Sequence, residues 1–107
     1  MDLHIKDRIY IPQILPQQNN LKEFYLKRSV FEKVAITEED RKNYNIQEDK
    51  ENGRITWDVE KDKTPLTVSF SEDEINYLKG ACEKLVDMNY PDDFWNVVEK
   101  IYDAANN

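Results

Sequence analysis

The sequence predicts an α+β domain in which a three-stranded antiparallel β-meander is packed on one face by α-helices. Two patterns support this class. Apolar and polar residues alternate at residues 54–59 and again at 66–70, whereas apolar residues recur at helical spacing before and after that stretch. A chain of 107 residues fits one domain, so residues 1–107 are expected to share a single core.

The N-terminal third is expected to contribute helices to this domain. Residues 20–35 place apolar side chains at helical spacing, and residues 37–44 begin with a threonine that suits a helix N-cap. Residues 3–15 fit either a strand or a helix that Pro12 would kink, and the sequence leaves this choice open. The expected apolar face of the helix at 20–35 comprises Leu26, Val30 and Val34, with Phe24 and Phe31 beside it.

The centre of the chain predicts a hairpin. Asn52-Gly53 lies between two strand-like runs, and this dipeptide favours a two-residue turn because both turn positions need a positive φ. The arms are therefore expected at 46–51 and 54–59. In that register Glu48 lies opposite Trp57.

A third strand is expected at residues 66–70, where the alternation of the second arm returns after a polar connection. Antiparallel pairing with the second arm would form one apolar face, which the helices would then cover. Trp57 lies at the centre of that face and is expected in the core. The predicted neighbours are Val59 with Leu66, Trp57 with Val68 and Ile55 with Phe70.

A helix at residues 72–88 follows directly. Ser71 and Glu74 have the spacing of a capping box, in which each side chain accepts a hydrogen bond from the other residue's backbone N–H. Gly80 lies in the middle of this helix and lowers its stability by about 1 kcal/mol relative to alanine. We expect close packing at Gly80.

A last helix is expected at residues 91–104, with Pro91 as its first residue. The apolar band of this helix is wider than is needed to cover one face of a small sheet. Beside the residues assigned to the core, Trp95, Val98 and Tyr102 form a second strip through their i+3 and i+7 spacing. This strip is either a protein interface, where Trp and Tyr are enriched, or a surface buried under the N-terminal helices.

The charge distribution bears on possible partners. The net charge of −7 opposes binding to nucleic-acid phosphates or anionic lipid, although residues 1–35 are positive at +2 and the remainder stands at −9. Helices followed by a hairpin also occur in winged-helix proteins, but residues 37–44 would present three consecutive acids to DNA. Direct nucleic-acid binding is not expected.

The inventory of reactive residues contains no catalytic constellation. His4 and Cys82 are the single histidine and cysteine, so they cannot form a disulfide or a structural zinc site. Gly53 and Gly80 are the two glycines, too few for a phosphate-binding loop. No cofactor is expected. The chain start lacks a secretory signal and no segment is long enough to span a membrane, which favours the cytoplasm.

Four segments together form a recognisable pattern: Asp7 to Pro16, Ile36 to Glu39, Tyr44 to Ile46, and Gly53 to Asp58. This pattern resembles a family of small phage and prophage proteins without an assigned activity. The resemblance implies a phage or mobile-element setting, hence the host cytoplasm, and no mechanism. A glycine usually follows the Leu-Pro step in that family, whereas Gln17 stands here.

The expected function is that of a non-enzymatic protein-interaction module that binds a protein partner or a second copy of itself. Two alternatives stay open. One is an acidic decoy that occupies a nucleic-acid-binding protein, with Glu48, Asp49 and Glu51 among the carboxylates that imitate phosphates. The other is an enzyme whose site these motifs do not reveal.

Overall fold

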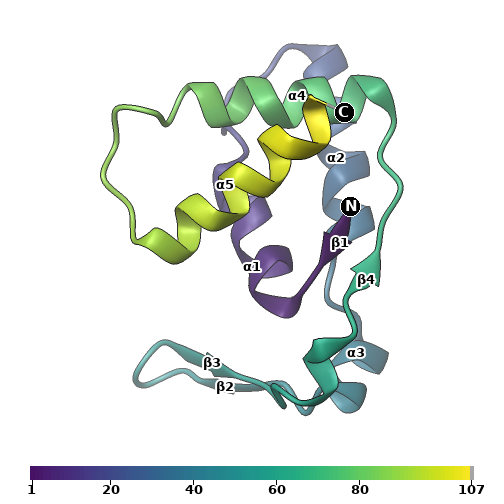
Figure 1. Cartoon of the computed structure of the whole chain (residues 1–107), viewed down its shortest axis with the longest axis vertical. Helices are drawn as coiled ribbons and strands as arrows, with labels where there is room; N and C mark the ends of the chain where they lie inside the picture. The colour runs from purple at the N-terminus through teal and green to yellow at the C-terminus, as the bar shows by residue number, and fades with distance from the viewer. Residues whose placement is uncertain (107) are drawn as a thin grey trace.

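A computed structural model describes residues 1–106 and shows an α+β fold built mainly of helices (Figure 1). The helices are α1 (Ile5–Ile14), α2 (Leu21–Val34), α3 (Glu38–Asn43), α4 (Glu72–Glu83) and α5 (Asp92–Ala105). The other elements are β1 (Asp2–Leu3), β2 (Gln47–Asp49), β3 (Arg54–Thr56), the 3₁₀ turn η1 (Lys61–Lys63) and β4 (Leu66–Thr67).

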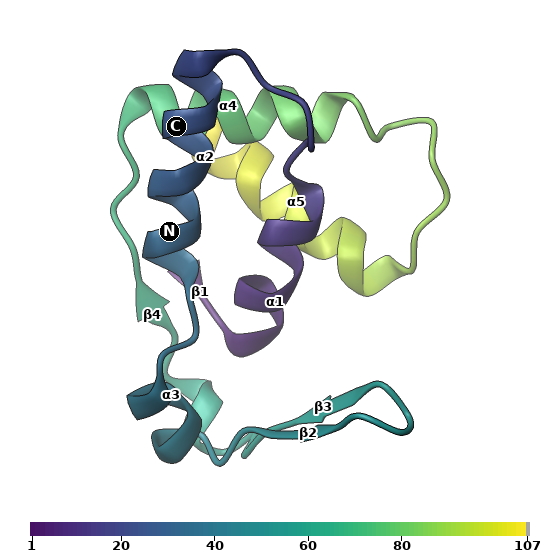
Figure 2. The same cartoon turned by 180° about the vertical axis from the view of Figure 1, so that it is seen from behind.

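The core lies between helices. α4 packs against both α2 and α5, and α1 contacts all three (Figures 1 and 2). The β2–β3 hairpin lies beside α3, at the end of the molecule opposite α4. The fully buried side chains of this core include Leu3, Ile11, Val30, Val34, Leu78, Cys82, Val97 and Ile101.

Two buried charged residues fix the helices to one another. Arg8 of α1 donates to the carbonyls of Val34 and Ala35 at the end of α2 and to the Asp40 carboxylate of α3, at 2.6 Å. Cations are favoured at helix C-termini, where carbonyls lack intrahelical partners. Glu74 joins α4 to α2 in the same way, because its carboxylate accepts hydrogen bonds from Ser29 and Lys33 as well as from its own N-cap.

Most of residues 3–15, which the sequence left as either strand or helix, form a helix. α1 includes Pro12, and His4 precedes the helix with its backbone N–H donating to Asp7 at 2.9 Å. Only the start of the segment is extended, since Leu3 belongs to β1. Ile5, Ile11 and Ile14 of this helix are buried, and Ile9 is half-buried.

The predicted three-stranded meander is wrong. β2 pairs with β3 and β4 pairs with β1, so the described residues form two separate two-stranded sheets. The N-terminal strand occupies the place that the hairpin was expected to take beside β4, and Met1 and Val68 exchange backbone hydrogen bonds at 2.8 and 2.9 Å. The predicted strand at 66–70 is correspondingly reduced to Leu66–Thr67.

The hairpin also has a different register from the predicted one. Glu48 lies opposite Ile55 rather than Trp57, and the loop contains four residues instead of two. The Asp49 carboxylate causes this change, because it accepts hydrogen bonds from the backbone N–H groups of Glu51 and Asn52 and from the Asn52 side chain. Only Gly53 of the loop has a positive φ, at 64°, so the expected two-residue turn is not formed.

Trp57 is not a core residue. It lies beyond the end of β3, is half-buried, and has no covered sheet face to occupy because both hairpin strands are exposed. The prediction that Trp57 is buried in the core is wrong, because it assumed the apolar face of a three-stranded meander.

The C-terminal helices are confirmed with adjusted ends. The Ser71–Glu74 capping box forms as predicted, with backbone N–H to side-chain distances of 2.7 and 3.1 Å. α4 ends at Glu83 rather than at residue 88, and turns with hydrogen bonds from Leu85 to Cys82 and from Met88 to Leu85 follow it. α5 begins after Pro91, which is its N-cap residue. Close packing at Gly80 is wrong, since a Cβ there would meet no atom within 4 Å.

Candidate protein interface on helix α2

The most distinctive surface of the molecule is the outward face of α2. We call the residues of this face the α2 stripe: Leu21, Phe24, Tyr25, Arg28 and Phe31. Their spacing places them on one side of the helix, opposite the buried Val30 and Val34. The apolar members are 67%, 49%, 51% and 38% exposed, for Leu21, Phe24, Tyr25 and Phe31 respectively.

Sequence reasoning misplaced part of this stripe. Phe24 and Phe31 were expected beside the core face, whereas both project outward. The core at α2 needs only the small side chains of Val30 and Val34, with Leu26 packed at its edge. A usable signal was present, because seven of the fourteen residues of α2 are apolar, more than a helix with one buried face requires.

Cations lie over the rings of the stripe. The Arg28 guanidinium carbon is 5.7 Å from the Phe24 ring centroid and 5.1 Å from that of Tyr25. The Lys27 ammonium lies 5.8 Å from the Phe31 centroid. Such contacts contribute about 0.5–1 kcal/mol each at exposed sites, and they hold the aromatic side chains in place without covering them.

A hollow of about 400 Å³ opens beside the stripe, between α2 and the segment that precedes it. Phe24 and Phe31 supply apolar walls, and Lys27, Arg28 and Glu32 supply charged groups. Apolar walls with a few charged groups are typical of a binding pocket.

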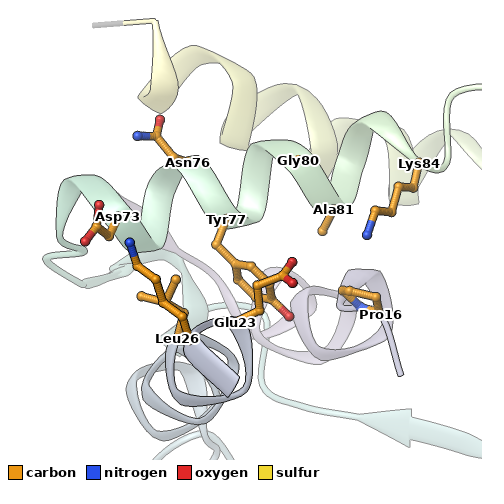
Figure 3. A pocket seen from close by; sticks show the side chains of 10 residues that line it. Pro16, Glu23, Leu26, Asp73, Asn76, Tyr77, Gly80, Ala81 and Lys84 are labelled. Atoms are coloured by element: carbon orange, nitrogen blue, oxygen red, sulfur yellow. The ribbon is translucent and has the colours of Figure 1, made fainter. Parts of the chain in front are cut away.

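A second hollow, of about 340 Å³, lies on the other side of α2, in the angle with α4 (Figure 3). Its walls include Leu26, Tyr77 and Ala81, and Gly80 leaves space there. The Tyr77 hydroxyl donates to Asn19 at 2.7 Å. Burial, with a smaller contribution from Glu23, raises the pKa of Tyr77, so the hydroxyl stays protonated and holds the segment before α2 in position.

A third hollow, of about 380 Å³, is lined by His4 and by charged groups that include Lys6, Asp7 and Lys100. These groups are paired with one another. Asp7 accepts from Lys100 at 2.6 Å and lies 3.7 Å from His4 Nδ1, and Lys6 pairs with Asp93 at 2.9 Å. Ion pairs of this kind connect α1 to α5, which gives the cluster a structural role.

Cys82 is separate from that cluster. It is fully buried in α4, and burial, assisted by Glu83, raises the pKa of its thiol to about 12. The thiol is therefore protonated at neutral pH and unreactive as a nucleophile. In the part of the chain that the structure describes, no group of His, Cys, Asp and Glu could hold a metal ion.

The strip predicted on α5 is only partly at the surface. Val98 is 4% exposed and belongs to the core, while Trp95 and Tyr102 are half-buried and pack against it. Trp95 makes edge contacts with Tyr90 and Phe94, at centroid distances of 5.7 and 5.9 Å. An interface at Trp95, Val98 and Tyr102 stays a prediction, with less free apolar surface than the α2 stripe offers.

Comparisons of this chain with protein-family models, with curated proteins and with solved structures gave no match. Within residues 1–106 there is also no helix with the length and apolar character needed to cross a bilayer.

Proposed function

We propose that this chain is a protein-interaction module that binds a partner through the α2 stripe. The observation that carries the proposal is the set of four large apolar side chains exposed together on one helical face. Contiguous exposed apolar surface typically marks an interaction site, and aromatic residues and arginine are enriched at the energetic centre of interfaces.

Binding is favoured over catalysis by the state of the reactive groups. The Cys82 thiol is buried with a raised pKa, and His4 lies among ion pairs that connect helices. The acidic decoy receives less support. Glu48 pairs with Arg41 at 3.0 Å and Asp49 is engaged in the hairpin turn, which leaves few free carboxylates on the hairpin to imitate phosphates.

The test is a selection of binding peptides from a random displayed library on the immobilised protein. The α2 variant is Phe24→Ser with Phe31→Ser, and the matched control is Val59→Ser with Val86→Ser, whose side chains are 68% and 58% exposed elsewhere. The control should keep the wild-type melting temperature within a few degrees, because substitutions of exposed residues change stability by about 0.5 kcal/mol or less. The α2 variant also loses two cation–ring contacts, worth about 0.5–1 kcal/mol each, and its melting transition is measured to verify that it is folded.

We expect enriched peptides to bind the wild type and the control and to lose binding to the α2 variant. Peptides that bind the α2 variant as tightly as the wild type would overturn the proposal, as would a failure to enrich any binder.

A further inference from the structure

We infer that the partner of the α2 stripe is an acidic segment of another protein, with an apolar anchor side chain flanked by Asp or Glu. This inference rests on the function proposed above and names the chemistry of the ligand. Its starting point is Arg28, at the centre of the stripe.

Arg28 differs from the buried and paired cations of the molecule. Arg8, Arg41 and Lys33 each contact a carboxylate, at 2.6, 3.0 and 2.6 Å. Within residues 1–106, Arg28 forms no ion pair, and Glu32 borders the same hollow without reaching it. Its guanidinium lies on two aromatic rings with its charge uncompensated.

The surroundings of Arg28 are positive, in contrast to the chain as a whole. The hollow beside Arg28 is bordered by two cations, Lys27 and Arg28, and by one acid, Glu32. Lys27 makes no ion pair within the described residues, and its ammonium donates only to the neutral carbonyl of Pro16, at 2.8 Å. The carboxylate of Glu23 is used in the capping box with Asn20. A chain of net charge −7 therefore presents a local positive surface here, which complements a partner's carboxylates.

The hollow beside Arg28 supplies the second requirement. Its walls of Phe24 and Phe31 suit an apolar side chain, and the guanidinium at its border suits a neighbouring carboxylate on the partner. Rings beneath the guanidinium exclude water from one of its faces, which strengthens its attraction to an anion. Both features are met by an apolar residue followed or preceded by an acid.

Single-stranded nucleic acid would also use aromatic rings and cations, but the negative balance of the whole chain opposes a polyanion. A second copy of this chain could offer acids from its hairpin, yet Glu48 and Asp49 are already engaged. The acidic segment of another protein is the occupant that the observations favour.

The experiment uses the displayed-library peptides that depend on the α2 stripe, labelled and measured by fluorescence anisotropy. Their sequences should be enriched in Asp and Glu next to aliphatic or aromatic residues. Arg28→Gln should weaken binding between about threefold and about tenfold, whereas Lys42→Gln, an exposed lysine of α3, should leave it unchanged. Replacing the peptide acids with amides should give the same loss, with no further loss on Arg28→Gln.

Other results separate the two proposals. Peptides rich in Lys or Arg, or an unchanged affinity in Arg28→Gln, would overturn the acidic partner and leave the interface standing. Binding of a thymidine oligonucleotide that Phe24→Ser abolishes would assign the stripe to nucleic acid. A dimer by light scattering that Phe24→Ser dissociates would assign it to a second copy. Either assignment would overturn the inference.

Discussion

Glu74 is expected to contribute stability at neutral pH that disappears in acid. Its side chain is 4% exposed, and burial alone would raise its pKa. Hydrogen bonds from Lys33, Ser71 and Ser29 outweigh burial and lower the pKa from its ordinary 4.5 to about 2. The charged carboxylate is thus stabilised by the fold.

The size of this contribution follows from the change in pKa. A pKa unit corresponds to about 1.4 kcal/mol, so the fall from 4.5 to about 2 corresponds to about 3 kcal/mol at neutral pH. Because the folded pKa is depressed, the contribution is present above pH 4.5 and is lost as the pH falls toward 2. Glu74→Gln removes the charge and should lower the free energy of unfolding by at most about 3 kcal/mol at pH 7.

The assay is urea denaturation of the wild type and Glu74→Gln at pH 7, 4 and 3. The difference between their free energies of unfolding should be largest at pH 7 and shrink at the two lower values. Glu72→Gln is the matched control, since this exposed acid in the same helical turn has no ion pair within residues 1–106. A difference that stays constant with pH, or is absent at pH 7, would refute the reasoning.

Four further outcomes are expected. Arg8→Met should lower the free energy of unfolding by about 3 kcal/mol in urea titrations, because Asp40 and the carbonyls of Val34 and Ala35 lose their partner. Gly80→Ala should raise the free energy of unfolding by up to about 1 kcal/mol, and with it the melting temperature, because the added Cβ meets no atom within 4 Å. A lower melting temperature would show that the site is crowded. Trp57→Ala should cost about 1 kcal/mol, far below the cost of removing a core tryptophan, and a larger loss would return Trp57 to the core. Cys82 should react with a thiol reagent only in denaturant, and rapid labelling of the native protein would contradict its burial.

The helices could be predicted because their signals are local. The capping box of Ser71 and Glu74 and the N-cap Thr37 act within one turn, and both form as the sequence indicates. The sheet could not be predicted in the same way. β1 pairs with β4 across more than sixty residues through two residue pairs, and a segment that short has no periodicity to detect.

The hairpin shows how one side chain changes a register. Asn52-Gly53 correctly marked a turn, but Asp49 offered its carboxylate to the backbone two and three residues ahead. Aspartate does this in many turns, and the competition between it and a two-residue turn depends on whether the arms have a face to bury. Both arms are exposed here, so no packing enforced the predicted register.

Helical periodicity identified the buried face of α2 but not its width. Sequence reasoning placed Leu26, Val30 and Val34 on that face, with Phe24 and Phe31 beside it. Val30 and Val34 are buried and Leu26 packs at the edge of the core, as predicted, whereas Phe24 and Phe31 are 49% and 38% exposed. Exposed aromatic rings lower solubility and add little to the stability of the isolated domain. Exposure of Leu21, Phe24, Tyr25 and Phe31 on one side of α2 is the arrangement on which the proposed interface depends.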